Sequence, residues 1–83
     1  MPKQTFIKLP IDKKETLIHA AKKEFSRVPL FEASIANIVK EAGIPRGSFY
    51  QYFEDKEDLY YFLLDEYSQR LRRRFISILK KQN

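Results

Sequence analysis

The sequence breaks at residues 43–45, Gly-Ile-Pro, between two short stretches whose apolar residues have helical spacing. The first stretch runs from Ser34, a residue type that caps helix N-termini, to Ala42. Glycine adopts the left-handed conformation that ends many helices, and a proline cannot simply continue one. The second stretch, Arg46 to Phe53, carries two phenylalanines one turn apart. The pattern predicts two short helices joined by a tight turn, which are the dimensions of a helix-turn-helix.

Longer stretches with a helical period flank this pair. Apolar residues follow helical spacing from Asp12, which with Glu15 resembles a capping box, to the residue before Pro29. After Asp55, a candidate N-cap, they recur at every fourth position to about Lys80. This last helix would extend about 37 Å, which is more than three short helices can cover. Part of its apolar face therefore needs another partner. Since no segment alternates with period two, we expect an all-α, homeodomain-like fold of three helices with a long fourth helix.

Composition and motifs exclude several function classes. The chain of 83 residues has room for one domain, and it lacks cysteine and has one histidine, which excludes a familiar zinc site and thiolate catalysis. The acids within residues 54–58 have the positions of helix caps, and no phosphate-binding glycine loop occurs. We expect no enzyme, metal site or cofactor. Without a signal peptide or an apolar run near the ~20 residues that span a bilayer, we expect a cytoplasmic protein.

The ends of the chain are basic and its middle is acidic. Of the net charge of +5, residues 1–28 hold seven basic and three acidic groups, residues 29–64 three and six, and residues 65–83 six and two. The excess of positive charge predicts an anionic partner, most often nucleic acid. Because the predicted helix pair lies in the acidic middle, we expect the specific contacts there, and the basic ends then supply phosphate attraction or an assembly surface.

The second helix of the pair has an unusual outward face. If Phe49 and Phe53 point inward, the other positions lie outward or on the flanks: Gly47, Ser48, Tyr50, Gln51 and Tyr52. An ordinary solvent-facing helix carries lysine and glutamate there, whereas this one has small and hydrogen-bonding groups and no acid. Glutamine can read adenine, hydroxyls can donate to phosphate, and glycine permits close approach. A packing role for the two tyrosines is the alternative that periodicity leaves open.

Residues 41–53, EAGIPRGSFYQYF, are followed by Lys56-Glu57-x-Leu59, and this ordered pattern resembles the DNA-binding domain of the tetracycline-repressor (TetR) family of bacterial regulators. The resemblance covers about residues 12–64. Residues 1–11 lie before it, and because they hold two prolines and no sustained period, we expect a basic N-terminal arm with Lys3 and Lys8 available to an anion. Residues 65–83 are expected to continue the fourth helix towards an effector and dimerisation domain that lies outside the given chain.

The resemblance also implies which residues touch DNA. Ser34 and Lys56 match residues that contact phosphates, and the matching tyrosines of the family clasp the DNA backbone. Arg46, Ser48 and Gln51 match positions that approach base edges or nearby phosphates, and Gly47 matches the family glycine. The implied DNA contacts are Ser34, Arg46, Gly47, Ser48, Tyr50, Gln51, Tyr52 and Lys56.

As a member of such a family, the protein would bind double-stranded DNA as a homodimer on a palindromic operator, usually to repress transcription. A small-molecule effector would act only through the C-terminal domain. A competing hypothesis follows from the basic amphipathic stretch over residues 70–83, which has the pattern of a helical interaction module or a membrane-surface module. The resemblance favours DNA binding, without a membrane partner.

Overall fold

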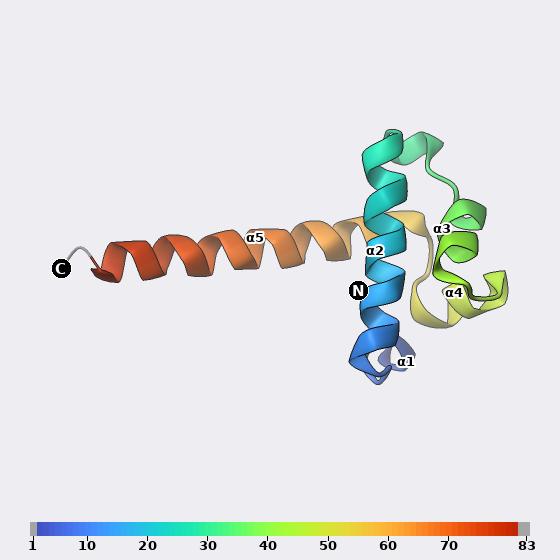
Figure 1. The fold of residues 1–83 in the computed structure, drawn as a ribbon, viewed down its shortest axis with the longest axis horizontal. Helices are drawn as coiled ribbons and strands as arrows, with labels where there is room; N and C mark the ends of the chain where they lie inside the picture. Colours follow the sequence, from blue (N-terminus) through green and yellow to red (C-terminus); the bar gives the residue numbers. More distant parts are fainter. Residues whose placement is uncertain (1, 82–83) are drawn as a thin grey trace.

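The computed structural model describes residues 2–81, and the regular structure within this range is entirely helical. Figure 1 shows a small compact part, residues 2–63, here named the head, from which the rest of the last helix projects far to one side. In chain order the elements are α1 (Gln4–Ile7), α2 (Ile11–Arg27), the 3-10 turn η1 (Leu30–Glu32), α3 (Ile35–Ala42), α4 (Arg46–Tyr52) and α5 (Lys56–Lys81). The predicted all-α architecture, with a helix-turn-helix and a long final helix, is confirmed.

Three predicted helix ends are confirmed by their hydrogen bonds and dihedral angles. The Oγ of Ser34 accepts a hydrogen bond from the amide of Asn37 at 3.2 Å, which caps the start of α3. Gly43 ends the same helix with φ of 72°, in the left-handed region where a side chain would be strained. Asp55 precedes α5, and its Oδ1 accepts from the amide of Asp58 at 2.8 Å.

The predicted capping box at Asp12 is wrong. Helix α2 begins one residue before Asp12, at Ile11, so Asp12 lies within its first turn and no side chain caps this end. Pro10 takes the capping position instead, with φ of −55°, and its carbonyl accepts from the amides of Lys13 and Lys14, both at 3.1 Å. The fixed φ of proline therefore starts the helix without a side-chain acceptor.

The core lies where α2, α3, α4 and the first turns of α5 meet. Its largest fully buried side chains are Ile38, Phe49, Phe53 and Leu59. Helix α2 contributes small residues beside Leu17, namely Ala20 and Ala21, which are at most 1 % exposed and let α3 approach closely. The two predicted inward phenylalanines are thus confirmed as core residues, and they fix which face of α4 points outward.

The N-terminal segment differs from the predicted arm. Residues 4–7 form the single helical turn α1, and the ring of Phe6 is 3 % exposed. Its centroid lies 4.9 Å from that of Phe53 and 5.5 Å from that of Phe62. A four-residue helix is too short to show a period in the sequence, which is why the pattern did not reveal it.

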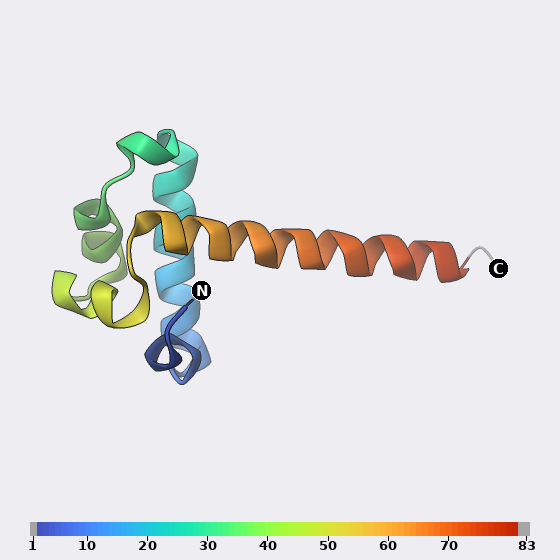
Figure 2. The ribbon, with the colours of Figure 1, turned by 180° about the vertical axis from the view of Figure 1, so that it is seen from behind.

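Helix α5 leaves the head after its first turns and continues alone, as the two opposite views in Figures 1 and 2 show. Leu59 is fully buried and Phe62 and Leu63 pack against the core. Beyond them the large apolar side chains are 45–63 % exposed: Leu64, Tyr67, Leu71, Phe75, Ile76, Ile78 and Leu79. The prediction that part of this face lacks a partner within the chain is confirmed for the described residues. None of the helices within residues 2–81 combines the length and apolar character that membrane crossing requires.

Candidate nucleic-acid interface

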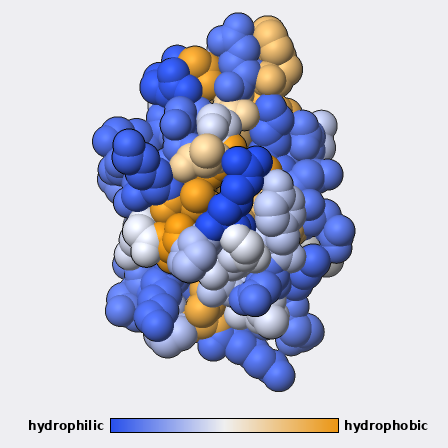
Figure 3. All heavy atoms as spheres, turned by 90° about the vertical axis from the view of Figure 1, so that its right-hand side faces the viewer, coloured by the Kyte–Doolittle hydropathy of each residue, from blue (hydrophilic) through white to orange (hydrophobic). Residues whose placement is uncertain are grey.

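Helix α4 buries one face and exposes the other. Phe49 is fully buried, whereas Arg46, Gly47, Tyr50 and Gln51 are exposed. No carboxylate occurs between Arg46 and Tyr52, although the surrounding segment is acidic. Figure 3 views the end of the molecule that carries α3 and α4, where pale, weakly polar atoms lie among strongly hydrophilic ones. The outward face of α4 therefore offers hydrogen-bonding groups and one positive charge to a partner.

Neither packing nor backbone conformation requires a glycine at position 47. A Cβ at this position would meet no other atom within 4 Å, and the residue does not have a positive φ. Glycine inside a helix costs about 0.5–1 kcal/mol relative to alanine. The missing side chain leaves the backbone of α4 open to close approach from outside, which is the property that a surface in contact with a large partner needs.

The two tyrosines of α4 have different surroundings. Tyr50 is 42 % exposed, and its ring stands edge-on to Phe49 with centroids 5.4 Å apart. Tyr52 is half-buried and contacts Phe6 edge-on at 6.3 Å, so it also belongs to the margin of the core. Packing therefore holds both rings at the border of the exposed face, and contact of their hydroxyls with DNA stays a prediction.

Ser34 and Lys56 meet at the connection that leads into α3. The Nζ of Lys56 donates to the carbonyls of Phe31 and Ala33, each at 3.0 Å. The Oγ of Ser34 caps α3, as described above. Both residues therefore hold the start of α3 in place, and their contacts with phosphate stay a prediction.

A buried carboxylate, which the sequence reasoning missed, fixes the same connection from the other side. Glu24 on α2 is 4 % exposed and accepts from Arg27 at 2.7 and 3.0 Å, from the amide of Ser34 at 2.8 Å, and from the Nδ2 of Asn37. Hydrogen bonding from Arg27, with smaller contributions from the other two donors, outweighs burial and lowers the pKa of Glu24 from 4.5 to about 2. The only sequence signal was an acid on the apolar face of a predicted helix, with an arginine three residues later.

Lys3 is engaged within the protein, contrary to its predicted availability to an anion. Its Nζ donates to the carbonyl of Tyr50 at 2.8 Å and lies 3.3 Å from the Oε1 of Glu54. Its backbone amide donates to the carbonyl of Tyr52, also at 2.8 Å. The residue thus joins the N-terminal segment to the end of α4.

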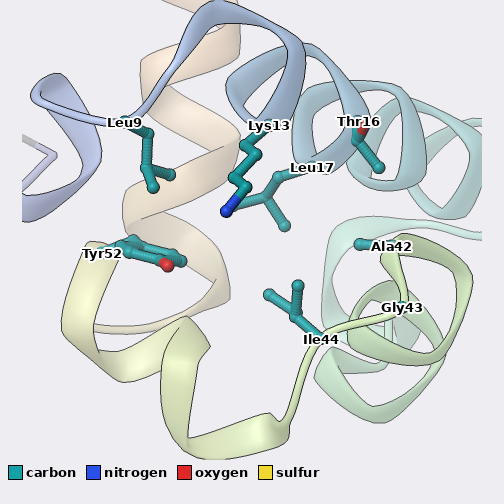
Figure 4. Close-up of a pocket in the computed structure, with 8 residues that line it drawn as sticks. All are labelled: Leu9, Lys13, Thr16, Leu17, Ala42, Gly43, Ile44 and Tyr52. Atoms are coloured by element: carbon teal, nitrogen blue, oxygen red, sulfur yellow. The ribbon is translucent and has the colours of Figure 1, made fainter.

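A pocket of about 340 Å³ lies between α2, the turn after α3 and the end of α4 (Figure 4). Its lining residues are Leu9, Lys13, Thr16, Leu17, Ala42, Gly43, Ile44 and Tyr52. Lys13 extends into it as the single charged group, and none of its walls carries a carboxylate, imidazole or thiol. Across residues 2–81, no group of three or more histidines and acids is placed to hold a metal ion.

Comparisons with known proteins agree with this geometry. Residues 17–61, just over half of the chain, match the family described as "Bacterial regulatory proteins, tetR family". The HTH-type transcriptional regulator YdgC of Bacillus subtilis (strain 168) is 35% identical over 69 residues, which cover 83% of this chain and 35% of YdgC. The HTH-type transcriptional regulator HbdR of Aromatoleum sp. (strain CIB) is 36% identical over 70 residues, which cover 80% of this chain and 31% of HbdR.

The crystal structure of a TetR family transcriptional regulator from Chloroflexus aurantiacus J-10-FL superposes with a TM-score of 0.76 at 40% identity, covering 88% of this chain and 36% of that one. The chain thus spans about a third of the length of the relatives it matches. These relatives are transcriptional regulators. The chain belongs to the TetR family of bacterial transcriptional regulators and carries the family's helix-turn-helix DNA-binding domain.

Proposed function

We propose that α4 enters the major groove of duplex DNA and reads a specific sequence there, while α3 lies against the DNA backbone. The observation that carries this proposal is the exposed face of α4, which has a glycine without a packing role, hydrogen-bonding side chains and no acid. A helix of this composition approaches base edges without repelling the phosphates beside them.

Each group on or beside this face, whether exposed or, like Ser48, half-buried, has a role that suits its chemistry. Arg46, Ser48 and Gln51 approach base edges or nearby phosphates, and glutamine pairs with adenine through two hydrogen bonds. Tyr50 and Tyr52, at the border of this face, donate their hydroxyls to the DNA backbone. Gly47 lets the backbone of α4 approach the DNA closely. Ser34 and Lys56 contact phosphates at the start of α3 and α5. An ammonium has three donors, and Lys56 uses two of them on protein carbonyls, which leaves one for a phosphate.

We further propose that the protein works as a homodimer on a palindromic operator and represses transcription by occluding a promoter. A single domain presents one reading helix, so tight and specific binding needs a second copy one helical turn of DNA away. The uncovered apolar face of α5 leads towards the part of a longer protein where dimerisation and a small-molecule effector would be placed. Such a regulator would work in the bacterial cytoplasm, on the chromosome.

Substitution of Gln51 tests the reading role. Selection from random duplexes with the unmodified protein first gives a preferred sequence. Gln51→Ala should then lower affinity for that sequence by about 5- to 150-fold, which corresponds to ~1–3 kcal/mol, and leave affinity for a scrambled duplex unchanged. Gln69→Ala is the matched control, because Gln69 is exposed on α5 and bonds to Asp65 away from α4.

Two outcomes would contradict the proposal. Equal losses on the preferred and scrambled duplexes would remove Gln51 from base reading. A preferred sequence without two-fold symmetry, selected at a concentration where sedimentation shows a monomer, would contradict the homodimer on a palindrome.

A further inference from the structure

The carbonyls at the C-terminal end of α4 all have partners, and most of these partners come from the N-terminal segment. The last four carbonyls of a helix lack intrahelical donors and must be satisfied from elsewhere. The amide of Phe53 donates to the carbonyl of Phe49 at 2.9 Å, which is the only one of the four bonds made locally. The other three carbonyls, of Tyr50, Gln51 and Tyr52, accept hydrogen bonds from residues 3–5.

Two residues supply these three bonds. Lys3 donates twice, from Nζ to the carbonyl of Tyr50 and from its backbone amide to the carbonyl of Tyr52, each at 2.8 Å. The Oγ1 of Thr5 donates to the carbonyl of Gln51 between them. The ammonium of Lys3 also lies at the negative end of the α4 dipole, where a positive charge is favourable. Residues 3–5 thus form a cap over the last turn of α4, here named the N-terminal cap.

A buried ring anchors the N-terminal cap. Phe6 lies next to it in the chain, is 3 % exposed, and packs against Phe53, which ends α4, and Phe62 on α5. Its ring also meets Tyr52 edge-on. The backbone of residues 3–5 is therefore held by the core, so that its donors are placed before any partner arrives.

We infer that Lys3 and Thr5 are positioning residues for DNA reading, which hold the last turn of α4 in the geometry that recognises bases. This inference rests on the function proposed above. Two of the three capped carbonyls belong to Tyr50 and Gln51, whose side chains are exposed, and the third belongs to Tyr52 at the margin of the core, so that fixing the carbonyls fixes the direction of the two exposed side chains. A helix of seven residues is marginal alone, and ordering its last turn in advance removes a cost that binding would otherwise carry.

The test compares Thr5→Val, which keeps the shape of the side chain and removes its donor, with Lys3→Met, which removes the ammonium. Both variants should lower affinity for the preferred duplex about fivefold or more, the factor expected for one lost hydrogen bond. Affinity for a scrambled duplex should change by less than about twofold for Thr5→Val, because phosphate attraction dominates there. Exchange of the Phe53 amide, which closes the last turn of α4, should become faster in both variants.

Matched controls separate positioning from general effects. Thr5→Ser restores a hydroxyl donor and should behave as the unmodified chain. Thr16→Val removes a hydroxyl that donates to the carbonyl of Asp12 within α2, and Lys8→Met removes an equal charge from an exposed position of the same N-terminal segment. Neither should change the ratio of affinities for preferred and scrambled duplexes or the exchange of Phe53.

The outcomes distinguish this inference from the proposed function. If Lys3 contacted DNA directly, Lys3→Met would weaken both duplexes equally and reduce the salt dependence, while Thr5→Val would have no effect; this result would overturn the inference. Unchanged exchange of Phe53 in both variants would also overturn it. If the unmodified chain selects no sequence, the proposed function fails, whereas faster exchange of Phe53 would still establish the N-terminal cap.

Discussion

The head and the outer part of α5 contain the same kinds of apolar residues, but only the head covers them. Phe53 is fully buried in the head, whereas Phe75 on α5 is 63 % exposed. Leu59 and Leu71 lie on one helix and differ in the same way, at 0 % and 49 %. Helical spacing predicts an apolar face in both regions. Whether that face is buried depends on neighbouring elements, and within the described residues only the first turns of α5 have them.

The largest expected effect follows from truncating a phenylalanine in the head. Phe53→Ala removes a ring that packs against Phe6, Phe49 and Phe62. We expect it to lower the free energy of unfolding by about 3–5 kcal/mol, which is comparable with the whole stability of a small domain. Urea unfolding followed by far-ultraviolet circular dichroism measures this loss.

Phe75→Ala is the matched change on the outer part of α5. Its ring is mostly exposed, so the free energy of unfolding should change by less than about 0.5 kcal/mol. Similar losses in the two variants would break the comparison, since they would show that both regions are equally packed.

The second effect concerns the buried carboxylate of the head. Glu24→Gln weakens the hydrogen bonds to Arg27 and to the start of α3, and we expect a loss of about 1–3 kcal/mol in the free energy of unfolding at neutral pH. Glu15→Gln, on the exposed side of the same helix, should have little effect. A larger loss for Glu15→Gln would contradict the assignment of the network to Glu24.

The same residue predicts a pH dependence. The pKa of Glu24 is about 2 in the folded protein, whereas its ordinary value, which applies to the unfolded chain, is 4.5. The unfolded chain therefore binds a proton at higher pH than the folded one. The stabilisation is therefore complete above pH 4.5 and is lost as the pH falls from there towards 2. Melting temperatures measured across this range should fall more steeply for the unmodified chain than for Glu24→Gln.

A third, smaller effect concerns the exposed face of α4 in the head. Gly47→Ala should raise the free energy of unfolding by about 0.5–1 kcal/mol, because alanine is the better helix former and its Cβ meets no atom within 4 Å. The same variant should weaken DNA binding, because the methyl group stands between α4 and the duplex. Opposite changes in stability and affinity are the expected signature of a glycine kept for a partner.

Gly43→Ala is the control for this prediction. Its position is equally open, but its φ of 72° strains any residue with a side chain, so this variant should lose about 1 kcal/mol. Stabilisation by Gly43→Ala, or unchanged DNA binding by Gly47→Ala, would contradict the roles assigned to the two glycines.

The smallest effect is expected on the outer part of α5. Leu71→Gln should change the free energy of unfolding by less than about 0.5 kcal/mol. Amide exchange should show protection near Leu59 that approaches the global value, with progressively weaker protection beyond Leu71, where neighbouring elements are lacking in the described chain. Uniform protection along α5 would show that its outer part is stabilised by a further contact, such as a second copy.

Local chemistry allowed much of the fold to be predicted from the sequence. Ser34, Gly43 and Asp55 mark helix ends through their own side chains or backbone freedom, and the structure confirms all three. The inward face of α4 followed from two phenylalanines one turn apart. These features depend on a few neighbouring residues, which is the range over which sequence patterns carry information.

Long-range contacts were not predictable in the same way. Residues 3–5 reach the end of α4 nearly fifty positions later in the chain, and α1 is too short to have a period. Glu24 looked like one of several acids until α3 placed Ser34 and Asn37 beside it. Lys56 was expected to contact phosphate, which stays a prediction, but nothing in the sequence pattern indicated the two hydrogen bonds that it donates to the carbonyls of Phe31 and Ala33.

The continuity of α5 makes it a lever. Its first turns are fixed in the core at Leu59, and it continues without interruption to Lys81, a distance of about 33 Å along the helix axis. A tilt of the head by ~10° about this fixed end therefore corresponds to a displacement of roughly 6 Å at the far end. A small rotation of α3 and α4 and a movement of several ångströms at Lys81 are thus two descriptions of one motion.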